Sequence, residues 1–353
     1  MDYLTTESAV RDTIGTPPPS INIKKLDVFE EHSKRYLEMS RLVAIAADCF
    51  SQGISFIARE SCKLRFLGDK SFSLEIDDFP EFADKVENEP CGLYVLVAGF
   101  EESLRINGKL TATSGKTGSL IFKIGLEELY FHCGKSIKRS DFWSPGDCSK
   151  IKETPARAVE FSSTRIKNFL DSAPFLLIAS KNSEGDVDLS PRGDPRGFIK
   201  VIDKQTVLIP ERPGNKIADS LVNITTNSSV SVTVLSPGSN NTLTLSGNAR
   251  LLTSPALLES SKVQNKLPKL GIELTVESCH FGVNPALAEM DLWNEGNFED
   301  RTQLPSLGRI LSDQLQATGK VPGKKSAIGR ALGRIAGSVG NVAVELDYKK
   351  NLY

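Results

Sequence analysis

Hydrophobic residues along the chain fall into short alternating runs separated by Gly, Asp and Pro, a spacing typical of antiparallel strands joined by tight turns. In the first half, Phe29 and Tyr36 fall on one face of an expected helix, and a short helix is also expected before Pro17. The segments predicted here are a helix over 26–39, strands at 42–47, 93–99, 104–111 and 129–131, and a hairpin over 64–76 that turns at 68–70.

The second half repeats this order of apolar runs. The matching segments are 175–179, 198–209, 230–235, 243–252 and 280–293. Two ungapped alignments support a duplication: residues 71–84 lie over 206–219, and residues 126–143 lie over 276–293. The second alignment ends in Trp in both copies, and these are the only 2 Trp of the chain. We therefore expect a small antiparallel barrel in each half; the alternative is two unrelated β-rich domains that share turn chemistry.

Composition narrows the class of protein. The 353 residues are enough for two domains, and the net charge of −1 argues against bulk binding to nucleic acid or a membrane surface. A polar start and the lack of any apolar run of about 18 residues lead us to expect a cytoplasmic protein. With 3 His, 6 Cys and no CxxC, GxGxxG, Walker A or GxSxG motif, we expect no metal site and no mechanism that needs several histidines.

The two copies differ in charge where a helix is expected to begin. The first alignment places Arg212 opposite Asp77 and Lys216 opposite Glu81. A helix N-terminus already favours anions, so Arg and Lys at that point would make a good site for a phosphate dianion. The alternative is a solvated turn with two incidental charges.

A second difference runs the other way. The second half carries Arg192 and Arg196 in residues 189–196 (LSPRGDPR), and the first half has no counterpart of this string. Conversely, only the first half carries a polar set at the end of its last strand. That set is His132, Lys135, Lys138, Arg139 and Ser140, aligned with Gly282, Pro285, Ala288, Glu289 and Met290. Complementary sets in two copies predict one composite site between the halves, with its pseudo-symmetric counterpart lost.

These motifs resemble a known family. The strings SPRGDPRGF, IPERPGNKIADSLVNI and LTLSGNARL, with LYFHCGKSIKRSDFW from the first half, are similar to the pyridoxamine 5′-phosphate oxidase-like proteins, the FMN-binding split barrels. The resemblance implies a mainly β (α+β) fold of two tandem split β-barrels that form an intramolecular pseudo-dimer. The expected divisions are 1–150, 151–300 and a short helical C-terminal extension over 301–353.

The resemblance also implies residue roles around one FMN per chain. Arg212, Lys216 and Arg192 would hold the phosphate and its neighbourhood, with Asn215 beside it. Ser190, Pro191 and Gly193 would offer backbone contacts to the isoalloxazine ring. From the first half, His132, Lys135, Arg139 and Trp143 would close the site. Arg192, His132 and Arg139 are the expected catalytic residues, which would polarise a small anionic substrate or the reduced flavin.

Several functions stay open at this point. The preferred one is an FMN-dependent oxidoreductase whose redox partner is NAD(P)H or oxygen. A haem-binding or haem-degrading split barrel, with His132 or His280 as axial ligand, is the alternative, and a non-catalytic binding scaffold is another. The chain is expected to be a monomer with an internal pseudo-dimer, or a homodimer. The basic segment 319–340 predicts either an amphipathic helix that binds a partner, an anionic surface or a cofactor phosphate, or an extension that packs on the barrels or is partly disordered.

Overall fold

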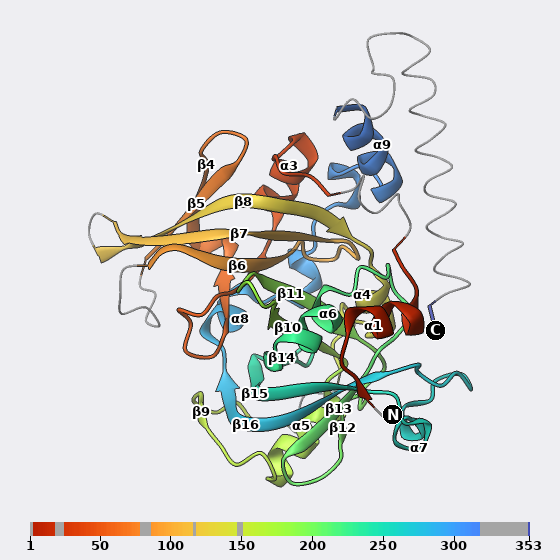
Figure 1. Cartoon of the computed structure of the whole chain (residues 1–353). Helices are drawn as coiled ribbons and strands as arrows, with labels where there is room; N and C mark the ends of the chain where they lie inside the picture. The colour runs from red at the N-terminus through yellow and green to blue at the C-terminus, as the bar shows by residue number, and fades with distance from the viewer. Residues whose placement is uncertain (1–2, 18–24, 78–85, 116–117, 147–150, 318–351) are drawn as a thin grey trace.

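The computed structural model describes residues 3–17, 25–77, 86–115, 118–146, 151–317 and 352–353. The first half forms a seven-stranded antiparallel sheet in the order β3-β2-β6-β7-β8-β5-β4, which curls into a barrel (Figure 1). Its strands are β2 (Leu42–Ala46), β3 (Ile54–Ala58), β4 (Cys62–Phe66), β5 (Ser71–Ile76), β6 (Val86–Leu96), β7 (Ser103–Ser114) and β8 (Leu120–His132).

The second half repeats this path as β11-β10-β14-β15-β16-β13-β12, with β1 added beside β15 and β9 beside β16. These strands are β1 (Tyr3–Leu4), β9 (Arg157–Ala158), β10 (Phe175–Lys181), β11 (Val187–Gly193), β12 (Lys200–Val201), β13 (Thr206–Pro210), β14 (Ser229–Leu235), β15 (Asn241–Leu252) and β16 (Gly271–Val283). The fold is thus mainly β, with two split barrels and short C-terminal helices, as the sequence predicts.

Strand register repeats between the two barrels. Ser71 lies opposite Gly125 in the first sheet, and Thr206 lies opposite Thr275 in the second. Ser71 aligns with Thr206 in the first alignment. Gly125 and Thr275 directly precede the segments 126–143 and 276–293 of the second alignment, so the two strand pairs are equivalent. The structure therefore reproduces both alignments, and the two halves share one topology.

A glycine bulge also recurs. The β7/β8 register shifts between Asn107 and Gly108, and the β15/β16 register shifts between Ser246 and Gly247. A Cβ on either glycine would lie 2.0 Å from a backbone oxygen of the neighbouring strand, so no larger residue fits.

Helices cover the ends of the barrels. They are α1 (Glu7–Ile14), α3 (Glu31–Met39), α4 (Lys135–Arg139), α5 (Thr164–Ser172), α6 (Asp219–Thr226), α7 (Pro255–Leu258), α8 (Pro285–Met290) and α9 (Leu307–Ala317). The helix predicted over 26–39 begins later, because a capping box between Glu30 and Ser33 sets its start and Leu26 pairs with Leu129. Strand β8 is longer than the predicted 129–131, since its solvent-facing Lys123 and Glu127 interrupt the apolar run.

Most of the described core lies in three clusters, one inside each barrel and one between them. In β2, Val43 and Ile45 face the first barrel's interior, whereas Leu42, Ala44 and Ala46 face the second barrel. Strand β10 divides its residues between the second barrel and the interface in the same way. Burial on both faces explains why these strands are continuously apolar.

Both ends of the described chain cross to the other barrel. Val10 of α1 is buried in the second barrel's core, and Leu307 and Ile310 of α9 are buried in the first barrel's core. Figure 1 shows α1 beside α6 and α9 near α3. The predicted segment 319–340 lies outside the described residues, and so does Glu81.

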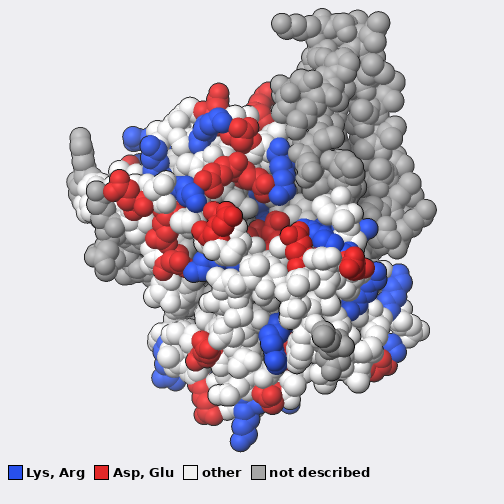
Figure 2. Space-filling view, in the orientation of Figure 1, with Lys and Arg blue, Asp and Glu red and all other residues white. Residues whose placement is uncertain are grey.

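Acidic and basic side chains are interspersed over the face shown in Figure 2, which agrees with the net charge of −1. Among the described residues, no helix is long and apolar enough to cross a membrane.

Candidate functional site

A cavity of about 550 Å³ lies between the two barrels. The first barrel contributes Arg105 of β7, His132 and Cys133 at the end of β8, and residues of α4. The second contributes the end of β11, the loop 211–218 and the start of α6. Of the described lining residues, eight are Lys or Arg and only three are carboxylates. A volume of this size suits a small-molecule ligand, and the excess of cations suits an anionic one.

The structure brings together nearly all the residues that the sequence predicts for the site. The predicted residues that line the cavity are His132, Lys135, Arg139, Ser190, Pro191, Arg192, Gly193, Arg212, Asn215 and Lys216. They come from both halves of the chain, so the cavity is a composite one.

Trp143 is the predicted site residue that the structure places elsewhere. Its ring packs against Phe142 and Phe298, with ring centroids 5.0 and 5.4 Å apart, and its Nε1 donates a 2.7 Å hydrogen bond to the Phe100 carbonyl. Its counterpart Trp293 is buried in the interface cluster. The two Trp that mark the alignment therefore belong to packing between the barrels and not to the cavity wall.

Close backbone contact joins the barrels at the cavity floor. A Cβ on Gly193 of β11 would lie 2.0 Å from the carbonyl oxygen of Ser136 in α4. Gly193 was expected to offer a backbone contact to the isoalloxazine ring, and the structure brings α4 of the other barrel against its Cα. Ser136 itself is 5% exposed, and its Oγ has no hydrogen-bond partner among the residues that the structure describes. A buried hydroxyl on a cavity wall can donate a hydrogen bond to a bound molecule or accept one from it.

The loop before α6 is conformationally strained. Lys216 and Ala218 adopt positive φ angles of 62° and 61°, which non-glycine residues rarely adopt. Asn215 stabilises the turn by accepting a 3.0 Å hydrogen bond from the Ile217 amide. Ala218 is the N-cap of α6 and provides no side-chain cap, so the first amides of the helix remain available to an anion. Such strain is concentrated at functional sites.

The two arginines expected near a phosphate already have carboxylate partners. Arg212 is 8% exposed; its Nε donates to Asp194 Oδ2 at 2.7 Å and its Nη2 donates to the Ser261 carbonyl at 2.6 Å. Arg192 Nε lies 2.9 Å from Glu211 Oε2, outside hydrogen-bond geometry, and its Nη2 donates to Ser220 Oγ at 2.6 Å. Burial raises the pKa of Asp194, and Arg212 opposes that rise. Lys216 is thus the cation of the predicted set that is exposed at this loop.

His132 is a neutral group in this cationic cavity. Burial, together with the positive charges of Arg105 and Arg192, lowers the pKa of His132 to about 3. Its Nδ1 makes no hydrogen bond to any other residue in the described part of the chain. The ring can therefore exchange a hydrogen bond with a ligand, and it carries no charge at neutral pH. The other histidine considered as a haem ligand, His280, lies on β16 opposite Ala158 and does not line the cavity.

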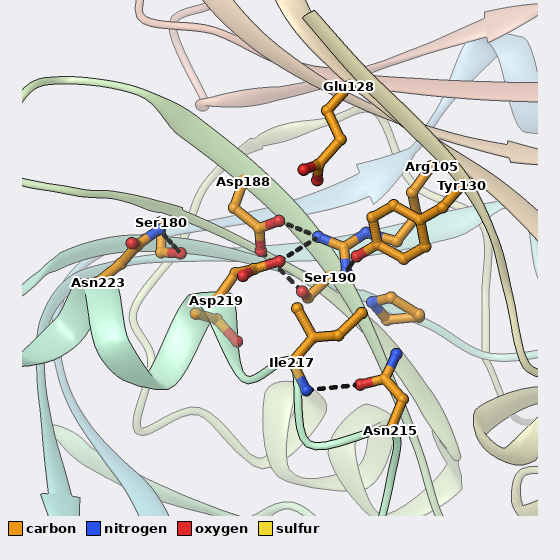
Figure 3. Close-up of polar contacts among 12 residues, drawn as sticks. Arg105, Glu128, Tyr130, Ser180, Asp188, Ser190, Asn215, Ile217, Asp219 and Asn223 are labelled. Atoms are coloured by element: carbon orange, nitrogen blue, oxygen red, sulfur yellow. Dashed lines mark hydrogen bonds and ion pairs between the residues drawn. The ribbon is translucent and has the colours of Figure 1, made fainter. Parts of the chain in front are cut away.

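A buried polar cluster that the sequence did not predict joins the two barrels, and its members Arg105, Ser190 and Asp219 line the cavity (Figure 3). Arg105 is 3% exposed and makes an ion pair with Asp188 of the other barrel. Arg105 also donates to the Tyr130 hydroxyl, and its Nη2 lies 3.8 Å from Asp219 Oδ2. Asp188 accepts a further hydrogen bond from Ser190 Oγ at 2.7 Å. A signal for this cluster existed, because Arg105 lies opposite Tyr130 where the second copy has Thr244 opposite His280.

Other lining residues were also not predicted. They are Ile14, Cys133, Ser136, Asp194, Phe198, Pro210, Glu211, Pro213, Gly214, Ile217, Ala218, Asp219, Ser220, Lys266, Leu267, Pro268, Lys269, Leu270 and Tyr353. The Tyr353 ring lies near two arginines, 5.9 Å from Arg139 and 5.8 Å from Arg212. Partial burial and the charge of Asp194 raise its pKa to about 12. No group of three or more His, Cys, Asp and Glu that could hold a metal ion occurs among the residues described.

A pair of curled barrels with a ligand-sized cavity between them defines a split-barrel protein. Residues 163–281 match the family model for pyridoxamine 5′-phosphate oxidase, and this range includes the second-barrel residues from 190 to 270 that line the cavity. The second barrel is therefore similar to the pyridoxamine 5′-phosphate oxidase family, as its motifs predict. No curated protein matches the chain.

Each of three solved structures is similar to about a third of this chain. The heme storage protein HutZ from Vibrio cholerae is 16% identical, with 35% of this chain and 94% of that one covered and a TM-score of 0.26. The FAD binding protein from Mycobacterium smegmatis is 17% identical, with 35% and 94% covered and a TM-score of 0.26. A pyridoxinephosphate oxidase family protein from Clostridium acetobutylicum is 11% identical, with 33% and 84% covered and a TM-score of 0.25.

Proposed function

We propose that this protein is an FMN-dependent oxidoreductase that binds one flavin in the cavity between its barrels and acts on a small anionic substrate. The observation that carries the proposal is the composite cavity, where cationic residues of both barrels meet a strained loop and an uncapped helix start. The match of the second barrel to the pyridoxamine 5′-phosphate oxidase family supports the choice of a flavin.

The phosphate of the ligand would bind at the loop 211–218. Lys216 would contribute charge, and the first amides of α6 would contribute hydrogen-bond donors. Arg192 and Arg212 would act mainly by holding this wall, since each is already paired with a carboxylate. Their role in the proposal is therefore electrostatic and structural, with direct contact left to Lys216.

The ring of the ligand would lie along β11. This strand ends its sheet, so one edge of its backbone lies outside the ladder and can bond a planar heterocycle. Residues 190–193 supply that edge, and His132, Lys135 and Arg139 face it from the first barrel. When bound, the flavin would supply hydride or electron transfer, while the protein supplies binding, orientation and electrostatics.

His132 and the cations have separate tasks in this proposal. The neutral His132 ring can donate or accept one hydrogen bond at Nδ1 without adding charge to the cavity. Arg139 and Lys135 would attract and orient the anionic substrate. The electron partner would be NAD(P)H or oxygen.

The absorption spectrum of the purified protein tests the proposal. We expect flavin bands and, after release, one FMN per chain. Lys216→Glu should weaken FMN binding, whereas the same change at exposed Lys204, which does not line the cavity, should not. A Soret band would instead indicate haem with His132 as the candidate ligand, and a colourless protein that takes up neither group would refute the enzyme proposal.

A further inference from the structure

Residues 3–17, here called the N-terminal arm, precede the first barrel in sequence but pack on the second. Strand β1 pairs Tyr3 with Leu252 and Leu4 with Leu251. The arm continues as α1, which begins at the N-cap Thr6 and ends at Gly15. Val10 of α1 is fully buried in the second barrel's core. The arm is therefore a structural part of the barrel that carries the family motifs.

The arm reaches the proposed phosphate loop through one guanidinium group. Arg11 Nη1 donates hydrogen bonds to the Lys216 carbonyl at 2.8 Å and to the Ile217 carbonyl at 3.0 Å. These are the two peptide oxygens between the positive-φ residues Lys216 and Ala218. Bonds from a charged donor to both oxygens offset part of the free-energy cost of this strained conformation.

Holding these carbonyls also orients the opposite side of each peptide. In a trans peptide the N–H points away from the C=O. The Ile217 carbonyl faces α1, so the Ala218 amide points away from α1. In the same way, the Lys216 carbonyl faces α1, so the Ile217 amide points away from α1 and donates to Asn215 Oδ1. Arg11 thus fixes the direction of two amides in a loop that lines the cavity.

Other contacts place the arm at the cavity itself. Ile14 lines the cavity, and the Thr13 carbonyl accepts a 3.0 Å hydrogen bond from Lys269, another lining residue. Gly15 lies against the Lys216 side chain, where an added Cβ would be 3.0 Å from Nζ. The arm therefore borders both the backbone and the side chain of Lys216.

We propose that Arg11 is a positioning residue that holds the loop 211–218 in its ligand-binding conformation, so that the site is assembled from both barrels and the N-terminal arm. The inference rests on the proposed function for the identity of the ligand. The part of the inference that concerns the loop's conformation is independent of the proposed function, because that conformation can be measured without ligand.

The test compares Arg11→Met, Arg11→Lys and Glu7→Gln in the full chain. Glu7→Gln removes the helix partner of Arg11, 3.2 Å away, but leaves its bonds to the loop, so it is the matched control. In Arg11→Met, we expect faster hydrogen exchange at the amides of 215–220 in the ligand-free protein. We also expect FMN affinity to fall about tenfold or more, because charged hydrogen bonds are lost. Arg11→Lys should restore part of the slow hydrogen exchange and part of the FMN affinity, and Glu7→Gln should match the wild type in both measurements.

Three outcomes decide between the claims. Unchanged exchange at 215–220 in Arg11→Met would overturn the inference. Unchanged FMN affinity, in a wild type that does bind FMN, would also overturn it while leaving the proposed function intact. A wild type that binds no FMN would refute the proposed function, and the exchange measurement alone would then decide whether Arg11 holds the loop.

Discussion

Removing Arg105 should destabilise the protein strongly, because this side chain joins the two barrels from a buried position. Arg105 and Asp188 are 3% and 5% exposed, and they come from different barrels. Arg105→Met would leave the Asp188 carboxylate buried with Ser190 Oγ as its remaining 2.7 Å partner and would remove a donor from the Tyr130 hydroxyl.

The size of the effect follows from desolvation. Removing one partner of a buried ion pair costs about 3–5 kcal/mol, because the remaining charge is uncompensated. Replacing both partners with apolar residues avoids that cost, so Arg105→Met with Asp188→Leu should lie within about 1–2 kcal/mol of the wild type. The expected result is a double variant that is more stable than the Arg105→Met single variant.

Urea unfolding measures both quantities. Trp293 is buried between the barrels and Trp143 packs beside it through Phe142, so their fluorescence reports on the interface, and circular dichroism reports on the strands. The two signals should give coincident transitions. Single-variant losses below about 1 kcal/mol, or a double variant whose loss equals the sum of the singles, would refute the account of a desolvated ion pair.

Three further predictions concern the cavity and its surroundings. His132 is neutral in the folded protein, so the free energy of unfolding should fall by up to about 1.4 kcal/mol per pH unit as pH drops from 6.5 towards 3, since the unfolded chain binds this proton first. In His132→Gln, the free energy of unfolding should fall less steeply over the same pH range. Equal slopes in the two proteins would contradict the assignment. Gly193→Ala should lower the free energy of unfolding by about 1–3 kcal/mol or more, because its Cβ forces Ser136 away. Gly125→Ala, whose Cβ would meet only the Lys109 oxygen at 3.8 Å, should lower it far less in the same urea assay. Trp143→Phe should lower the melting temperature through the lost bond to Phe100 yet leave flavin affinity unchanged; a loss of affinity without a loss of stability would return Trp143 to the site.

The sequence was sufficient to predict the repeated barrels because their evidence is local. Alternating apolar residues report strands directly, and the difference between aligned copies identified Lys216 and His132 as members of one composite site. Each of those residues could be found without knowing what it touches.

Residues that act through distant partners were not predictable in this way. Arg105 meets Asp188 across 83 residues, and Arg11 meets Lys216 across 205. Arg212 was expected to face a ligand, yet its burial beside Asp194 depends on how the β11 end and the following loop pack together. Nothing in the spacing of Asp194 and Arg212 shows that one neutralises the other.

The crossing of the N-terminal arm imposes an order on assembly during protein synthesis. Residues 3–17 leave the ribosome before either barrel, but β1 has no partner strand until Leu251 and Leu252 have been made. At about 5–20 residues per second, this delay is about 12–50 s. The first barrel has its own strands long before then, except for the α9 contacts that arrive last. The loop 211–218 can therefore reach its final conformation only after translation has passed Leu252, when a segment made early packs against segments made much later.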